Sequence, residues 1–141
     1  MISDNLKLKG HLNIALNGET VKEVDNIVVT AGKGYVASRM KDATATAMSH
    51  MAIGTSSTAA AAGNTTLGSE SARVSLTSTT VSSNEVVYVA TFPAGTGTAA
   101  ITEAGILNAS SSGTMLCRTV FSVVNKGASD SMTITWTVTV S

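Results

Sequence analysis

The last segment of the chain constrains its fold more than any other. Between Met132 and Val140, an apolar residue and a threonine alternate without interruption. Successive side chains of a β-strand point to opposite faces, so one face of this segment is expected to be apolar and the other to be threonine. The apolar side consists of Met132, Ile134, Trp136, Val138 and Val140. A helix would not gather these residues on one side, so the pattern predicts a half-buried strand with Trp136 as its core anchor.

The threonine side of this strand carries no charge, although a face that meets only water usually includes Lys or Glu. Such a face can be solvated. It can also pack against a neighbouring chain through hydroxyl bonds and methyl contacts. The segment therefore raises the hypothesis that the protein assembles with other chains.

Composition sets bounds on the class of protein. A chain of 141 residues fits one domain with a substantial core. Charged residues make up 13% of it and the formal net charge is zero, which argues against nucleic acid and charged membrane surfaces as partners. No stretch approaches the length of a membrane span. The first residues lack the basic and apolar regions of a secretory signal.

A hairpin is predicted at the start of the chain. Apolar residues alternate loosely from Lys7 to Leu16, and Asn17-Gly18 is a pair typical of two-residue turns. The return strand would run from Glu19 to about Val24. Because this region holds most of the charge in the first third of the chain, we expect residues 1–26 to form a solvated hairpin or arm. Residues 27–141 would then form the main domain.

The remaining elements predict a mainly β fold. A single helix is expected over 31–41, and a loop of small residues over 54–64. Further strands are expected over 50–53, 73–81, 85–92, 99–107, 114–123 and 131–140. Short strands separated by turns at this spacing favour an antiparallel β-sandwich or barrel. The predicted architecture is thus such a sandwich or barrel with one short helix and an N-terminal hairpin.

Residues that could carry chemistry are few. Neither His11 nor His50 stands at a metal-ligand spacing from cysteines or carboxylates. Cys117 is the only cysteine, so no internal disulfide can form, and its strand-like surroundings predict a buried, inert thiol. No serine lies in a nucleophile-elbow pattern. We therefore expect no catalytic residues, no cofactor and no metal, and we expect that the protein is not an enzyme.

Glu103 is the one unusual carboxylate, because it interrupts an otherwise apolar strand, Ala100–Leu107. A buried charge must be paired or hydrogen-bonded. Arg73 and Arg118 are the candidate partners for a structural ion pair, since each lies among apolar and hydroxyl residues. The alternative is a glutamate on the solvent side of the strand.

Three segments resemble a family of small virion proteins from tailed bacteriophages. They are Met51–Thr58, Phe92–Ala109, and the stretch from Gly113 to the threonine strand. The most specific element is Ile101-Thr102-Glu103-Ala104-Gly105-Ile106, and a similar string occurs in phage tail-fibre and collar proteins. The resemblance covers about residues 27–141. One departure is the run Ala59–Ala62, where the family would be expected to have a proline.

The resemblance implies a structural protein of the virion. The implied role is capsid decoration, as a cement protein that bridges subunits of the major capsid protein. By analogy with such proteins, we expect a homotrimer that is made in the host cytoplasm and resides on the capsid surface. The alternative is a structural component of the tail, collar or fibre base.

Overall fold

The computed structural model describes residues 6–41 and 45–141. The described chain is mainly β, with one short helix. In chain order its elements are β1 (Leu8–Leu16), β2 (Glu19–Val28), α1 (Thr30–Lys41), β3 (His50–Gly54), β4 (Glu70–Ser75), β5 (Ser78–Ser82), β6 (Glu85–Phe92), β7 (Ala99–Leu107), β8 (Met115–Lys126) and β9 (Met132–Val140). All strand pairs are antiparallel, and the spatial order is β4-β3-β7-β8-β2-β1-β9-β6-β5.

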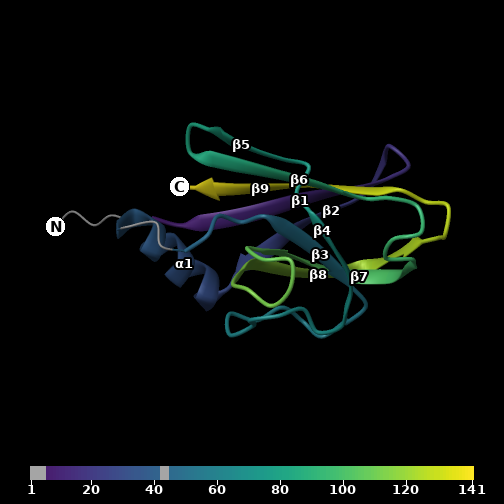
Figure 1. Ribbon diagram of the computed structural model, residues 1–141, viewed down its shortest axis with the longest axis horizontal. Coiled ribbons are helices and arrows are strands. Elements are labelled where there is room, and N and C mark those ends of the chain that lie inside the picture. Colours follow the sequence, from purple (N-terminus) through teal and green to yellow (C-terminus); the bar gives the residue numbers. More distant parts are fainter. Residues whose placement is uncertain (1–5, 42–44) are drawn as a thin grey trace.

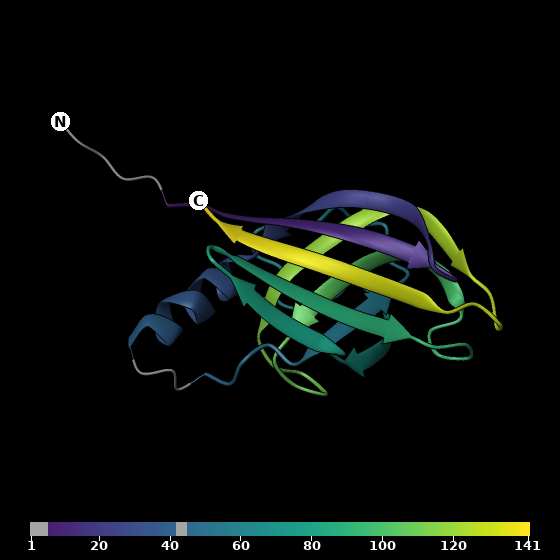
Figure 2. The same cartoon turned by 90° about the horizontal axis from the view of Figure 1, so that it is seen from above.

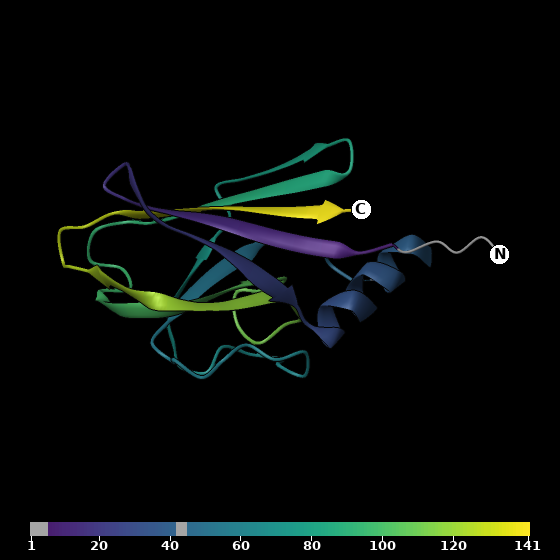
Figure 3. The same cartoon turned by 180° about the vertical axis from the view of Figure 1, so that it is seen from behind.

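This single sheet curls into a half-barrel, which confirms the predicted fold class. Strands β5, β6, β9 and β1 form one layer, and β8, β7, β3 and β4 form the other (Figure 1). Strand β2 crosses from the first layer to the second (Figure 3). Its first part pairs with β1, and only Ile27 and Val28 pair with β8. The main apolar core lies between the layers, where Phe92, Ile101 and Trp136 are fully buried.

The two edges of the sheet meet at a corner between β4 and β5. The sequence predicts one strand over 73–81, but the structure has two strands at opposite edges of the sheet. The Leu76 N–H donates to Ser49 O in one layer, while the Thr77 N–H donates to Val89 O in the other. The chain therefore changes layers between these two residues, as strands do at the corners of packed sheets.

The N-terminal hairpin forms as predicted, and both of its strands are part of the sheet. Asn17 and Gly18 adopt φ values of 51° and 86°, as a tight hairpin turn requires. Strand β1 then pairs with β9 along its whole length, and its Leu12 and Ile14 are fully buried. Lys9, Glu23 and Asp25 lie on the outer side of the same strands, whereas Lys22 lies on the side of the buried Ile14 and donates to Ser122 Oγ. The boundary at residue 26 consequently falls inside β2.

Helix α1 lies at one end of the half-barrel, near the C-terminal end of β9 (Figure 2). Its Tyr35 and Val36 pack against the main core. Gly32 weakens the helix by propensity, yet it is buried, and a Cβ there would lie 2.3 Å from Leu116 O on β8. The glycine therefore permits the close contact between helix and sheet.

Candidate interaction face and the contacts that support it

The outer side of β9 is the threonine surface that the sequence predicts. Because Met132, Ile134 and Trp136 are fully buried on the inner side, the four threonines point away from the core and are half-buried. Neighbouring strands extend this surface. We call it the threonine face, and it comprises Thr133, Thr135, Thr137 and Thr139 of β9, Val87, Val89 and Thr91 of β6, and Asn13 of β1. Hydroxyl groups and methyl groups thus alternate over an uncharged, pleated surface.

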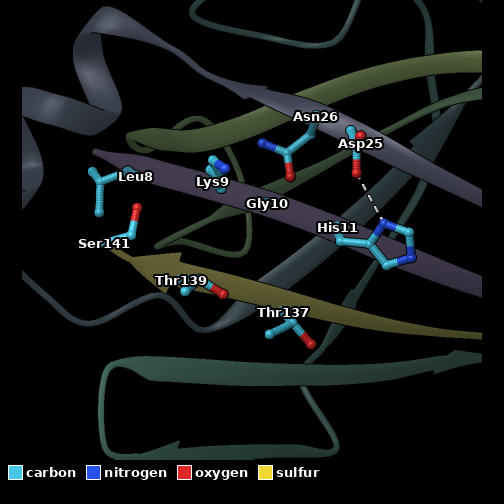
Figure 4. Close-up of a pocket in the computed structure, with 9 residues that line it drawn as sticks. All are labelled: Leu8, Lys9, Gly10, His11, Asp25, Asn26, Thr137, Thr139 and Ser141. Carbon is cyan, nitrogen blue, oxygen red and sulfur yellow. Dashed lines mark hydrogen bonds and ion pairs between the residues drawn. The ribbon is translucent and has the colours of Figure 1, made fainter. Parts of the chain in front are cut away.

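Charged residues gather at one end of the threonine face. Lys9 and Glu85 both lie opposite Thr139, and His11 lies opposite Thr137. An open hollow of about 580 Å³ lies here, and its lining includes Lys9, His11 and Thr139 (Figure 4). The opposite end, around Thr133 and Thr135, remains uncharged.

His11 forms the main polar contact of this hollow. Its Nδ1 lies 2.9 Å from Asp25 Oδ1, and its Nε2 lies 3.4 Å from Glu23 Oε1. The hydrogen bond with Asp25, followed by that with Glu23, raises the pKa of His11 above its ordinary value of 6.5. The two carboxylates therefore favour the imidazolium form and balance its charge. All three side chains are at least half exposed, so solvent screens their interaction.

Beneath the threonine face, Asn26 fixes the indole of Trp136. The Trp136 Nε1–H donates to Asn26 Oδ1 at 2.6 Å. Asn26 reaches Trp136 across Gly10, its cross-strand partner on β1. A Cβ at Gly10 would lie 1.6 Å from Asn26 Oδ1, so only glycine leaves room for this contact. Sequence reasoning missed Asn26, because nothing in its local pattern shows which strand will lie beside it.

On the other layer, Glu103 and Arg118 form a buried ion pair. Glu103 Oε1 lies 3.0 Å from Arg118 Nη2 and 3.1 Å from Arg118 Nε. Their side chains are 0% and 2% exposed. The structure therefore brings together two of the three residues named as ion-pair candidates, and Glu103 is not on the solvent side.

Glu103 also organises the loop 55–69. Its carboxylate accepts hydrogen bonds from the backbone N–H groups of Ser56, Gly68 and Ser69 at 2.7–3.0 Å. Burial alone would raise the pKa of Glu103, but these donors and Arg118 outweigh it and hold the pKa below the ordinary value of 4.5. The charged carboxylate is thus the form that holds both ends of the loop.

Arg118 holds the middle of the same loop. Its guanidinium donates to Thr58 O at 3.0 Å and to Asn64 Oδ1 at 2.9 Å. Leu67 is buried beneath the loop in a second, smaller apolar cluster with Ala52 and Met115. A segment of 15 residues without regular structure is therefore held in place largely by hydrogen bonds to Glu103 and Arg118 and by the burial of Leu67.

All three segments quoted for the family resemblance meet at this ion pair, because Arg118 lies in the third. Gly54, in the first segment, is the cross-strand partner of Glu103 in the second. A Cβ at Gly54 would lie 2.6 Å from Glu103 Oε2 and 2.3 Å from Ser69 O. Thr102 Oγ1 donates to Ser56 O at 2.8 Å. The short strings around Gly54 and Glu103 thus have a shared structural role, which is to secure the loop 55–69.

Arg73 is not a partner of Glu103. It pairs with Glu70, three residues earlier, at 2.7 Å, and it donates to the carbonyls of Ala109 and Ser112. The strand order explains why Arg118, and not Arg73, pairs with Glu103. Arg118 lies on β8, beside β7, whereas Arg73 lies on β4, with β3 in between.

Lys126 is a buried polar residue that sequence reasoning missed. It is 2% exposed, and its Nζ donates to Pro93 O at 2.9 Å and to Asp130 O at 2.7 Å. The predicted strand ended at residue 123, whereas β8 continues to Lys126. Extending the alternation from Val124 would have placed Lys126 on the inner side of the strand.

The remaining candidates, Cys117 and His50, lie on β8 and β3. Cys117 is buried, and burial raises the pKa of its thiol to about 12. His50 contacts the hydroxyl groups of Ser49 and Ser75. Within residues 6–41 and 45–141, no three His, Cys, Asp or Glu side chains are grouped so that they could hold a metal ion. The same ranges contain no helix with the length and apolar character to cross a membrane.

Comparisons with known proteins found no match for this chain. No family model matches the chain. No curated protein and no solved structure matches it either.

Proposed function

We propose that this chain is a structural protein of a bacteriophage virion, where it decorates the capsid and bridges neighbouring subunits of the major capsid protein. The resemblance of three segments to small virion proteins supports this role. The observation that carries the proposal is the threonine face, a broad surface whose centre is uncharged.

The chemistry of the threonine face suits a protein partner. The centres of protein–protein interfaces are depleted in charged residues relative to the rest of the surface. The uncharged end around Thr133, Thr135 and Val89 has this character, and its hydroxyl groups can bond to a facing backbone. The charged residues near His11 would then lie at the rim of the contact, where they set orientation more than affinity.

The loop 55–69 supplies a second surface on the opposite side of the molecule. It lies outside the layer formed by β8, β7 and β3, away from β6 and β9 (Figures 1 and 3). None of its residues is charged, and Glu103 and Arg118 hold it in place. A bridging protein needs two such surfaces to contact two neighbours, and an ordered loop loses less entropy on binding than a mobile one.

The test uses particles that lack the protein and receive it back in purified form. Bound wild-type protein should raise the temperature at which the heads release DNA. Thr135→Lys places a charge in the uncharged part of the threonine face and should reduce binding strongly. Thr98→Lys adds the same charge at an exposed threonine before β7 and serves as the matched control, with binding as in the wild type.

Two results would oppose the proposal. If Thr135→Lys binds as well as Thr98→Lys, the threonine face is not the contact. If particles without the protein are full and stable but lack functional tails, the tail, collar or fibre-base role replaces capsid decoration.

A further inference from the structure

Strand β5 forms an exposed edge of the sheet. It pairs only with β6 within the described chain, and all five of its residues, Ser78–Ser82, are exposed. It lies at the outer margin of the layer that carries the threonine face (Figures 1 and 2). An antiparallel strand uses alternate residues for each neighbour. About half of the backbone N–H and C=O groups of β5 therefore face the free edge.

This edge lacks the features that prevent edge strands from associating. Natural edge strands commonly carry charged residues or proline. The sequence of β5 is Ser-Thr-Thr-Val-Ser, with neither, and Val81 is 71% exposed. The opposite edge differs, because β4 contains Glu70 and Arg73, which form an ion pair. The β5 edge is thus uncharged, rich in strand-forming residues and open to another strand.

We propose that β5 pairs with β5 of a second copy of this chain, in antiparallel fashion around a two-fold axis at Thr80. This register places Thr80 opposite its own copy, Thr79 opposite Val81, and Ser78 opposite Ser82. Each position then meets a residue of similar size, and no like charges face each other. Cross-strand pairs of this kind, between hydroxyl and β-branched residues, stabilise antiparallel sheets.

The arrangement is closed and extends an existing surface. A two-fold contact uses the same edge on both copies and leaves no free β5 edge, so the assembly stops at two chains. Thr80 lies opposite Val87, and Val87 lies opposite Thr137. The threonine faces of two copies would therefore join into one continuous surface. This contact gives pairs of chains, in contrast to the trimer implied by the resemblance, and it does not rest on the proposed function.

The contact is small, so the pairing is expected to be reversible. Five residues on each side bury far less than the ~1,600 Å² of a standard stable interface. Sedimentation equilibrium from about 1 μM to about 1 mM covers the range for such contacts. Wild-type protein should move from monomer to dimer over this range, with no larger species.

Charge substitutions at Thr80 test the register directly. In Thr80→Glu or in Thr80→Lys, two like charges would face each other across the axis, and each variant alone should dimerise at least ~10-fold more weakly than the wild type. An equimolar mixture of the two variants pairs opposite charges and should recover dimerisation at low salt. Thr98→Glu and Thr98→Lys are the matched controls, and each should dimerise as the wild type does.

Three outcomes would overturn the inference. Wild-type protein could remain monomeric at about 1 mM, which is above the dissociation constant expected even for weak contacts. It could form trimers, which a two-fold contact at β5 does not produce. The Thr80 variants could also dimerise like the wild type, and the contact would then lie elsewhere on the molecule.

Discussion

Glu103 Oε1 lies 3.0 Å from Arg118 Nη2 on the adjacent strand, and both side chains are almost completely buried. Removing two charges from water carries a large desolvation penalty, so a buried pair is weak evidence of stability. Here the remaining hydrogen bonds of the two side chains go to the loop 55–69, to its backbone and to the side chain of Asn64. We infer that the pair specifies the conformation of this loop.

Loss of one partner of this pair should strongly destabilise the folded protein. Glu103→Ala leaves the Arg118 charge buried without its carboxylate and releases three backbone donors of the loop. The free energy of unfolding should fall by about 3–5 kcal/mol, measured by urea denaturation. Glu70→Ala, which breaks the partly exposed pair with Arg73, is the control and should cost about 1 kcal/mol or less. Equal losses in the two variants would show that the buried pair has no special role.

Acid should destabilise the protein through the same carboxylate. The pKa of Glu103 is lower in the folded chain than its ordinary value of 4.5, so the unfolded chain binds this proton more tightly. The stabilising contribution is therefore present above about pH 4.5 and is lost as the pH falls through the folded pKa. Urea midpoints from pH 6 to pH 2 should fall less steeply in Glu103→Gln than in the wild type. If the urea midpoints of the two proteins fell in parallel with pH, Glu103 would not be the source of the acid sensitivity.

Trp136 should dominate the stability of β9. It is fully buried, and Trp136→Ala should lower the free energy of unfolding by roughly 3–5 kcal/mol, as deletion of a large core aromatic does. Thr137→Ala, the next residue on the opposite face, should change it by less than about 0.5 kcal/mol. If that face binds a partner, Thr137→Ala should instead weaken assembly. Small, equal changes in stability would mean that the two faces of β9 are wrongly assigned.

Two glycines should respond to alanine with opposite signs. Gly10→Ala forces a methyl group into Asn26 and displaces it from the Trp136 indole, so it should destabilise by about 1–3 kcal/mol and alter the tryptophan fluorescence. Gly34→Ala, within α1, meets nothing within 4 Å and should stabilise by about 0.5–1 kcal/mol through helix propensity. A neutral Gly10→Ala would show that Asn26 does not depend on the open space above that glycine.

Local patterns were sufficient to predict most strands, the turn at Asn17-Gly18 and the single helix. They did not predict features of the fold that depend on contacts between residues far apart in the sequence. The break between Leu76 and Thr77 has no Gly or Pro to mark it, because it arises from hydrogen bonds to Ser49 and Val89. The pairing of β1 with β9 joins residues more than a hundred positions apart, and no local pattern in the first hairpin indicates it.

The candidate site was only partly predictable for the same reason. Glu103 stood out as a charge in an apolar strand, and the threonine pattern identified an uncharged outer face. The choice of Arg118 over Arg73 required the strand order. The contact of Asn26 with Trp136 required the register of β2 on β1.

The central claim is that this protein decorates a phage capsid. An electron cryo-microscopy map of purified phage particles, from a phage that carries the gene for this chain if the proposal holds, tests it most directly. We predict many copies of this half-barrel on the head, each with the threonine face or the loop 55–69 against the major capsid protein. Density only in the tail, or no density for this chain anywhere in the particle, would contradict the account.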